Sequence, residues 1–408
     1  MSFPTTPDIG LLQGKNIVII GLQAWYTDIG SNCKSIAKEL SLNNRVLYIN
    51  MPLDRKTIAQ QKNDPNIRRH LQIIRNKEER LVAVAPNLWN YYPAAILESI
   101  NWIPSTAVFS FFNRINNRRF SRDIKTAVKK MGFDKYILFN DNDIFRSFYL
   151  KELLRPEIYI YHSRDNLLGV DYWKRHGTVI EPAHIAKADI GMANSIYLAN
   201  YLRKYNSNAW YIGQGCNIAL FNAEAPYEIP EDLRSIPHPL IGFVGAINTI
   251  RIDEAAIRCI ARERPQWNIV LIGPEDDYFA KSELHGMPNV YFLGKKPIDQ
   301  LPRYIAAFDA CINPQLVNPV TIGNYPLKVD EYLAMGKPVV ATRTEAMEIF
   351  GGNVYLAENP AAFPPLIDQA LSEDNGERRR QRIELARQHT WAESAKQMHL
   401  AIKNTISP

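Results

Sequence analysis

The stretch "PLKVDE" at residues 326–331 combines residue types that together can hold a phosphorylated ligand. Proline suits the first position of a helix, so the spacing predicts a helix that begins at Pro326, with the backbone amides of Leu327 and Lys328 free at its positive end. Such a helix end binds anions, and the Lys328 side chain adds a charge. Glu331 lies on the same helical face, where its carboxylate can accept hydrogen bonds from a ribose diol. This pattern predicts a nucleoside diphosphate site, and the alternative is a solvated Lys328–Glu331 pair worth roughly 0.2–0.5 kcal/mol.

Polar side chains also follow two apolar runs in the first half of the chain. The stretch "YIYHSRDNLLG" places His162 and Asp165 after a predicted strand, and "FNDNDIF" places Asp141 and Asp143 after another. Ligands of parallel sheets bind outside the carboxyl ends of the strands, so these residues are candidates for a site. An Asp in this place can instead cap the next helix, and His162 can be a hydrogen-bonded residue at the rim.

Alternating strands and helices must position these residues. Apolar runs alternate with helical patterns along the chain, which is typical of βαβ units and parallel sheets. The first series predicts strands at 16–21, 45–50, 80–86, 135–140, 157–162 and 188–194, with helices at 31–42, 116–131 and 195–205. The second series predicts strands at 240–245, 267–273, 289–294, 308–314, 337–342 and 353–358, with helices at 253–263, 298–307, 326–335 and 360–372. The predicted fold class is therefore α/β.

Length and composition support two domains in one chain. A chain of 408 residues exceeds one ordinary core, and the proline-rich, aperiodic stretch 222–239 reads as a linker. We therefore expect domains over 1–222 and 223–390, with a terminal helix over 391–408 that packs back onto the first domain. The four cysteines form no close pair, which argues against a zinc ribbon or a disulfide framework and suits a reducing cytoplasm. No signal peptide and no membrane span is predicted.

Charge is distributed unevenly between the two halves. Residues 1–220 carry a formal net charge of +11 and the remainder carries −5. The most basic stretch, 109–132, alternates Arg and Lys with an apolar stripe that includes Phe112, and such a helix can rest on an anionic lipid surface. The alternative is a domain helix whose apolar stripe is core. No recognised binding motif accompanies the charge, so nucleic acid is not expected as a partner.

Several segments carry a resemblance to one known family. The string "PLKVDEYLAMGKPVVAT" resembles the donor-binding signature of GT-B fold glycosyltransferases, in the family-four-like group (glycosyl transferases group 1) that uses nucleotide sugars. The segments "IGFVGAI", "NIVLIGPE", "NVYFLGKKPIDQLPRYIAAFDACINP", "ADIGMANSIYLANYLRKYN" and "IGQGCNIALFN" resemble the same family. The resemblance covers nearly all of 188–342. It implies two Rossmann-like domains facing a central cleft, with the donor nucleotide on the C-terminal domain and the acceptor mainly on the N-terminal one.

The resemblance implies roles for residues of the second domain. Glu331 would bind the ribose, and the amides around Pro326, Leu327 and Lys328 would bind the diphosphate. Gly245 would let the diphosphate pass close to the backbone. The base would meet the backbone of two further donor-binding residues, Gly294 and Lys295.

Two positions depart from the pattern of the family. Many members have a Glu near the sugar where this chain has Gly323, so the loop 317–324 must supply other groups, and Asn318 and Thr321 are the candidates. Many members also have a basic residue where this chain has Ala246. Arg251 follows a few residues later and can replace that charge.

The acceptor side is expected on the first domain. In the resembling enzymes the loop after the first strand faces both the sugar and the acceptor, which assigns Gly30 and Ser31 to the acceptor side. Asp28 in the same loop is either a catalytic carboxylate or a solvated residue. Asp165 or His162 would orient the acceptor beside the reacting sugar.

We therefore expect a cytoplasmic glycosyltransferase that moves a sugar from a nucleoside diphosphate donor to an acceptor alcohol in polysaccharide or glycolipid biosynthesis. A retaining outcome is implied by the resemblance alone. Lys328 and Arg251 would neutralise the leaving diphosphate, so no cofactor and no metal ion is expected. The expected partners are the nucleotide sugar, a sugar or lipid-linked acceptor, and the inner face of an anionic membrane. One alternative is a nucleotide-sugar epimerase of the same fold. The other is a non-catalytic scaffold subunit, which is favoured by the presence of Gly323 where many family members have a Glu.

Overall fold

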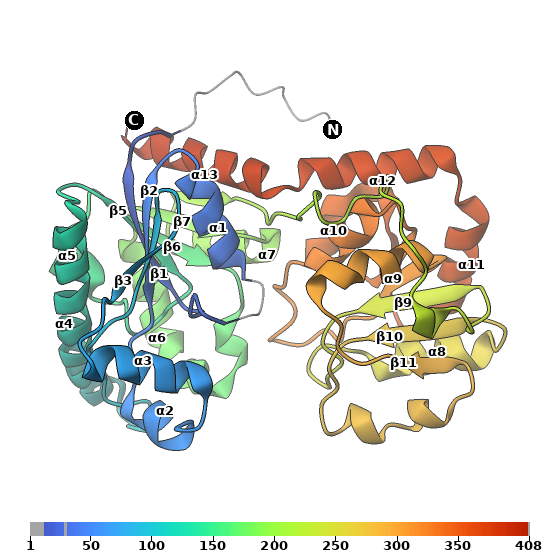
Figure 1. The fold of residues 1–408 in the computed structure, drawn as a ribbon, viewed down its shortest axis with the longest axis horizontal. Coiled ribbons are helices and arrows are strands. Elements are labelled where there is room, and N and C mark those ends of the chain that lie inside the picture. The colour runs from blue at the N-terminus through green and yellow to red at the C-terminus, as the bar shows by residue number, and fades with distance from the viewer. Residues whose placement is uncertain (1–11, 28–30, 407–408) are drawn as a thin grey trace. The chain divides into compact units, whose positions relative to one another are not determined.

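Two compact units make up the chain. The computed structural model describes residues 12–27 and 31–406. The first unit comprises Met1–Gly213 with Ser394–Pro408, and the second comprises Gln214–Glu393. Each unit contains one sheet that is parallel or nearly so, with helices between its strands, so the predicted α/β class with two Rossmann-like domains is confirmed (Figure 1). The units are described separately below.

The sheet of the first unit has eight strands in the order β3-β4-β2-β1-β5-β6-β7-β8. The bounds are β1 Asn16–Gly21, β2 Arg45–Asn50, β3 Leu81–Ala85, β4 Leu88–Tyr91, β5 Ile137–Asp141, β6 Ile158–Ser163, β7 Ile190–Ala193 and β8 Ala209–Tyr211. All neighbouring pairs are parallel except β3 with β4. The predicted strands are present, whereas β4 and β8 were not predicted. The carboxyl ends of β5 and β6 carry Asp141 and His162.

Helices of the first unit connect these strands. Their bounds are α1 Asn32–Ser41, α2 Arg55–Gln60, α3 Pro65–Arg75, α4 Thr106–Met131, α5 Leu150–Leu154, α6 Asp171–Lys187, α7 Ile196–Arg203 and α13 Trp391–Ile406. Helix α4 begins ten residues before the predicted 116, because Ser105 caps it by accepting a hydrogen bond from the Val108 amide. Phe120 and Ile124 of α4 pack in the same core as Val18 of β1. Helices α4 and α5 lie side by side along this unit (Figure 1).

The terminal helix α13 belongs to the first unit from Ser394 onward. Its side chains Met398 and Ile402 are buried, and the Asn208 amide donates to the Thr405 hydroxyl (3.0 Å). The chain thus returns to the unit in which it began. Among residues 12–27 and 31–406, no helix is long and apolar enough to cross a membrane.

The sheet of the second unit has six parallel strands in the order β11-β10-β9-β12-β13-β14. The bounds are β9 Leu240–Val244, β10 Asn268–Ile272, β11 Val290–Phe292, β12 Ala310–Asn313, β13 Val339–Thr342 and β14 Tyr355–Ala357. Its helices are α8 Glu254–Glu263, α9 Leu301–Ala307, α10 Leu327–Ala334, α11 Phe363–Glu373 and α12 Gly376–Gln388. All six strands lie where the sequence predicts them, and only α12 was not predicted. Val329 and Leu333 of α10 are fully buried against Val244 and Ile272, which anchors α10 beside the end of β9.

Candidate functional site

A row of glycines lies at the carboxyl ends of three neighbouring strands of the second unit. Gly245 follows β9, Gly273 follows β10 and Gly294 follows β11, with φ of +148°, +154° and +66°. The Gly245 amide donates to the Ile272 carbonyl (2.9 Å) and the Gly273 amide donates to the Gly294 carbonyl (3.0 Å). A Cβ on Gly273 would lie 1.8 Å from the Gly245 oxygen, so only glycine fits there. This edge therefore offers bare backbone to a ligand. The sequence had not singled out Gly273 as a site residue.

The start of α10 differs in detail from the prediction. The helix begins at Leu327, and Pro326 is the residue just before it. The Leu327 amide donates to the Tyr325 carbonyl (3.1 Å), so it is not the free donor that the sequence predicts. The Lys328 amide has no backbone acceptor in the described part of the chain. One amide rather than two therefore remains at this helix end for an anion.

Lys328 lies against the glycine row. Its Nζ is 4.3 Å from the centre of the Phe243 ring, and a Cβ on Gly245 would come within 2.9 Å of it. The side chain is half-buried. Burial, and then the positive charge of Arg251, lower the pKa of Lys328 to about 8. An anion at this position would favour the protonated lysine, because it would replace the hydration that burial removes.

Glu331 is half-buried on the same helix. Burial raises the pKa of Glu331 to about 8, while Lys328 acts in the opposite direction. Within residues 12–27 and 31–406, no ion pair joins Glu331 to Lys328. The two side chains are thus neither fully solvated nor paired, which argues against the surface-pair alternative. Their binding roles remain predictions.

Two further residues hold α10 in place. Asp330 is fully buried and accepts hydrogen bonds from the Tyr325 hydroxyl (2.7 Å) and His389 Nδ1 (2.8 Å). The Tyr332 hydroxyl accepts from the Val244 amide (2.8 Å), which ties the helix to the end of β9. These contacts fix the orientation of Lys328 and Glu331 relative to the glycine row. Sequence reasoning missed them, because His389 is 59 positions from Asp330.

The loop 317–324 uses its polar side chains to hold its own shape. Asn318 donates to the Ile250 carbonyl (2.7 Å) and accepts from the Val320 amide (2.8 Å). Thr321 is fully buried, and its hydroxyl bonds to the Leu316 carbonyl and to the Asn318 amide (3.0 Å). The structure therefore shows Asn318 and Thr321 as residues that shape the loop. Their contact with a sugar remains a prediction.

Arg251 and Lys295 lie on the surface of the second unit. Arg251 is exposed, and its Nη1 is 2.9 Å from the Asn324 side chain when that amide turns its oxygen toward the guanidinium. The positive charge of Arg251 also contributes to the lowered pKa of Lys328. Lys295 is exposed directly after Gly294, and its backbone contact with a base remains a prediction.

Replacing Glu331 tests the ribose assignment. Glu331→Ala is expected to weaken nucleotide binding by about 1–3 kcal/mol, because two ribose hydroxyls would lose their acceptor in a largely buried site. Calorimetric titration with UDP measures the loss. Glu263→Ala, an exposed Glu on α8, is the control and should bind as the wild type does. Unchanged affinity in Glu331→Ala would remove the ribose assignment.

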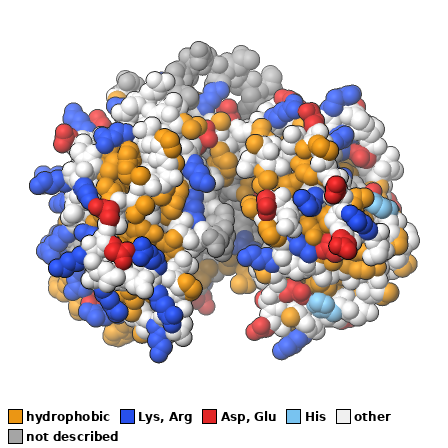
Figure 2. Space-filling model, viewed as in Figure 1, with side chains coloured by type: hydrophobic (Ala, Val, Ile, Leu, Met, Phe, Trp, Pro, Cys, Tyr) orange, Lys and Arg blue, Asp and Glu red, His pale blue; other side chains and the backbone are white. Residues whose placement is uncertain are grey.

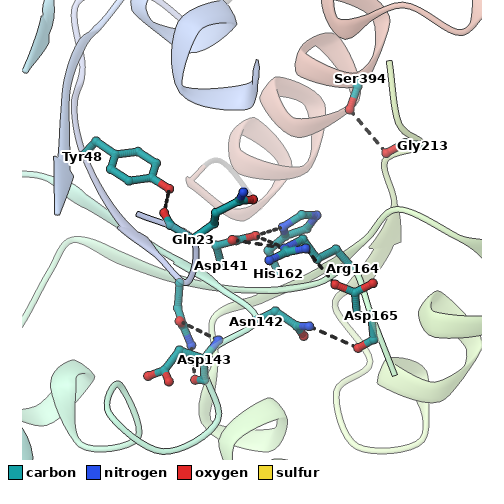
Figure 3. Close-up of polar contacts among 11 residues, drawn as sticks. Gln23, Tyr48, Asp141, Asn142, Asp143, His162, Arg164, Asp165, Gly213 and Ser394 are labelled. Carbon is teal, nitrogen blue, oxygen red and sulfur yellow. Dashed lines mark hydrogen bonds and ion pairs between the residues drawn. The ribbon is translucent and has the colours of Figure 1, made fainter. Parts of the chain in front are cut away.

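A second polar cluster lies at the carboxyl edge of the first sheet. Asp141 and His162 are fully buried, and His162 Nδ1 lies 3.1 Å from Asp141 Oδ1 (Figure 3). Arg164 Nε donates to Asp141 (3.2 Å), and its Nη1 donates to Asp165 (2.7 Å). Burial alone would raise the pKa of Asp141, but Arg164 and the hydrogen bond from His162 outweigh it, so the pKa is lowered. The sequence placed His162 and Asp165 correctly at a strand end, but it did not single out Arg164, which bridges Asp141 and Asp165.

The remaining first-unit candidates differ in their surroundings. The Asp165 carboxylate is about a third exposed, whereas His162 Nε2 is buried and has no hydrogen-bond partner among the described residues. Ser31 precedes α1, and its buried hydroxyl makes no hydrogen bond to the helix end. Gly30 and Asp28 lie outside the described residues. Across residues 12–27 and 31–406, no group of three or more His, Cys, Asp or Glu is placed to hold a metal ion.

Comparisons with known proteins agree with this architecture. Residues 238–373 match the sequence family described as glycosyl transferases group 1. A protein of Bacillus subtilis (strain 168), assigned to teichuronic acid biosynthesis as the glycosyltransferase TuaH, is 27% identical over 240 residues, which are 56% of this chain and 60% of that protein. The chain thus spans less than two thirds of the length of this relative.

Solved structures resemble the whole chain. The sucrose-phosphate synthase of Thermosynechococcus elongatus superposes with a TM-score of 0.67 at 16% identity, covering 96% of this chain and 99% of that one. Anabaena HepE in complex with UDP and glucose superposes with a TM-score of 0.64 at 15% identity, covering 96% and 100%. At these identities the likeness shows the fold, which is the GT-B fold. The match to glycosyl transferases group 1 is confined to residues 238–373, which lie within the second unit.

Proposed function

We propose that this protein is a glycosyltransferase that transfers a sugar from a nucleoside diphosphate to an acceptor alcohol in polysaccharide or glycolipid biosynthesis. The observation that carries the proposal is the bare glycine row of Gly245, Gly273 and Gly294 beside the half-buried Lys328. A nucleotide with two phosphates needs close backbone approach and positive charge at the same place, and this edge supplies both. Anabaena HepE, which shares the fold, is seen with UDP and glucose, which supports UDP as the carrier.

The residues of the second unit then have distinct tasks. Lys328, the Lys328 amide and Arg251 stabilise the negative charge that develops on the leaving diphosphate, so no metal ion is required. Glu331 holds the ribose. A retaining outcome follows from the family likeness only and is part of the proposal. In the first unit, Asp165 or His162 orients the acceptor hydroxyl.

Thermal stabilisation by a panel of nucleotide sugars tests the proposal. A ligand at 100 times its dissociation constant stabilises the folded protein by about 2.7 kcal/mol, so the correct donor should raise the melting temperature well above the effect of ATP or free sugar. Product analysis with the best donor then separates the alternatives. An epimerase would convert the donor without acceptor, and a scaffold subunit would bind without turnover. Stabilisation by no nucleotide sugar would contradict the proposal.

The exposed face of α4 supports a contact with an anionic membrane. Phe111 is 64% and Phe112 is 41% exposed. If the apolar stripe of α4 were entirely core, Phe112 would be buried. The same face continues with Arg118, Arg122 and Lys125, which are exposed and form no ion pair within the described residues. Lys and Arg side chains gather along the left-hand edge of the first unit (Figure 2). Apolar rings followed by unpaired cations suit the headgroup region of a bilayer.

Vesicle binding tests the membrane contact. The protein is expected to bind anionic vesicles and not neutral ones, and binding should fade as salt shortens the Debye length from about 10 Å at 0.1 M toward 3 Å at 1 M. Replacing Arg118, Arg122 and Lys125 with Gln should abolish binding, whereas the same number of changes on the second unit, at Arg262, Lys281 and Arg303, should not. Failure of the wild type to bind anionic vesicles at low salt would exclude this contact.

A further inference from the structure

The first unit contains a cavity of about 610 Å³ that none of the roles above uses. The start of α2, the segment 97–102, the first turns of α4 and α6, and the loop after β5 line it. Several of these segments follow the carboxyl ends of β2, β5 and β6, which is the edge that carries Asp141 and His162. Ligands of α/β sheets bind at this edge. The cavity therefore lies where an acceptor of the first unit is expected.

Arg146 lines the cavity, and its guanidinium donates no hydrogen bond to any of the described residues. Its side chain is 25% exposed, and its Nη2 forms a long ion pair with Asp54 Oδ2 (3.7 Å), which is beyond hydrogen-bonding distance. Asp54 is already satisfied, because it accepts from the Ser99 hydroxyl (2.6 Å) and from the amide (3.0 Å) and hydroxyl (2.8 Å) of Thr57. A guanidinium has five N–H donors in a planar fork that matches a carboxylate or a phosphate. The cavity thus presents a guanidinium whose charge Asp54 partly balances and whose N–H donors remain available to an oxyanion.

Aromatic side chains surround this guanidinium. Trp102 is 72% and Tyr172 is 50% exposed at the cavity, and Trp173 and Phe145 stack on one another with ring centres 5.2 Å apart. Flat apolar faces beside polar donors can pack on the face of a sugar ring while its substituents are hydrogen-bonded. The exposed fractions of Trp102 and Tyr172 leave their rings free to do so.

Hydrogen bonds hold the rim of the cavity in place. Asn101 Nδ2 donates to the Tyr172 carbonyl (2.6 Å), and Trp102 Nε1 donates to the Ser99 carbonyl (2.9 Å). Arg175 Nη1 donates to the carbonyls of Asn101 and Trp102 (3.3 Å each). The segment 97–102 is therefore tied to α6, and both exposed rings sit on a braced framework. Such preorganisation lowers the entropic cost of binding.

We propose that this cavity is the acceptor site and takes a sugar that carries an oxyanion, a phosphate or a carboxylate. Arg146 binds the oxyanion through two parallel N–H donors, and Trp102 and Tyr172 pack against the sugar ring. An uncharged sugar would leave the Arg146 donors unpaired and would bind more weakly. This inference rests on the proposed function, because it names the acceptor class of the same enzyme.

Direct binding tests the proposal independently of turnover. The full-length protein is first titrated with UDP, which tests the donor site alone, and is then kept saturated with UDP. Glucuronic acid, glucose 1-phosphate and glucose are titrated in turn, with calorimetry and tryptophan fluorescence as readouts. At least one anionic sugar is expected to bind at least tenfold more tightly than glucose. Comparison of glucuronic acid with glucose 1-phosphate shows whether the site prefers a carboxylate or a phosphate.

Variants decide whether the cavity is responsible. Arg146→Gln is expected to weaken the anionic sugar at least tenfold and to leave UDP binding unchanged, whereas Arg203→Gln, an exposed Arg on α7, should change neither. If Arg146→Gln does not fold, Trp102→Ala at its exposed position should weaken the same sugar at least threefold. Equal binding of glucose and the anionic sugars, no binding at millimolar concentration, or full affinity in Arg146→Gln would overturn the proposal. Failure of UDP itself to bind would instead count against the proposed function.

Discussion

Lys328→Ala is expected to lower kcat by about 10²–10³-fold while changing the affinity for the donor much less. Charge on the diphosphate grows as the bond to the sugar breaks, so a cation at this position stabilises the transition state more than the bound substrate. The position of Nζ against Gly245 and Phe243 puts that charge at the glycine row. Steady-state kinetics with saturating acceptor, together with UDP titration, separate the two effects. A loss confined to KM would make Lys328 a residue for ground-state binding.

The pH profile of the same residue gives a second check. With a pKa of about 8, Lys328 is charged below that pH and loses its charge as the pH rises through it. The kcat/KM of the wild type for the donor, which reports the free enzyme, should therefore decline above about pH 8. Lys328→Arg keeps its charge at every pH used, so its lower kcat/KM should not show that decline. Lys281→Ala, an exposed lysine outside the site, should behave as the wild type does.

Asp141→Ala is expected to destabilise the first unit by about 3–5 kcal/mol. The substitution leaves the Arg164 guanidinium, only 18% exposed, without its buried partner and removes the acceptor of His162. Asp165→Asn, which removes a carboxylate that is 36% exposed, should cost no more than about 1 kcal/mol. Urea unfolding, followed by the signal of the first unit, measures both.

The pH dependence of stability follows from the same cluster. The folded-state pKa of Asp141 is lowered. The contribution of Asp141 to the free energy of unfolding is therefore present above its unfolded-state pKa and is lost as the pH falls through its folded-state pKa. The wild type should therefore lose stability in acid more steeply than Asp141→Ala does. If Asp141→Ala lowers the free energy of unfolding by less than about 1 kcal/mol, the Asp141–Arg164 pair contributes little to stability. UDP binding by the second unit should survive in this variant.

The fold could be predicted largely from local patterns. The six strands of the second unit are apolar runs bounded by turns, and Gly245, Gly273 and Gly294 follow three of them in the sequence. The short strands β4 and β8 were missed, and length alone does not explain this, because β11 and β14 are as short and were predicted. Helix α12 was also missed. It is strongly charged and its buried residues are Arg382 and Ala386, so no apolar stripe marks it.

The site could be predicted only where one segment carries it. Lys328 and Glu331 lie in a single stretch, so their shared helix was visible in the sequence. The partners of Asp330 and Arg146 come from distant segments. Only the folded chain brings His389 to Asp330 and Asp54 to Arg146. The free amide of Leu327 was wrongly predicted, because a helix pattern does not reveal that Tyr325 turns its carbonyl toward it.

Hydrogen–deuterium exchange with and without UDP tests the central claim most directly, because it locates the nucleotide without any substitution. UDP binding is expected to slow exchange at 242–247, 271–275, 292–296 and 325–331, which contain the glycine row and the start of α10. The first sheet should show no comparable protection. Protection confined to the first unit, or absent at the glycine row despite saturating UDP, would contradict the assignment of the donor site.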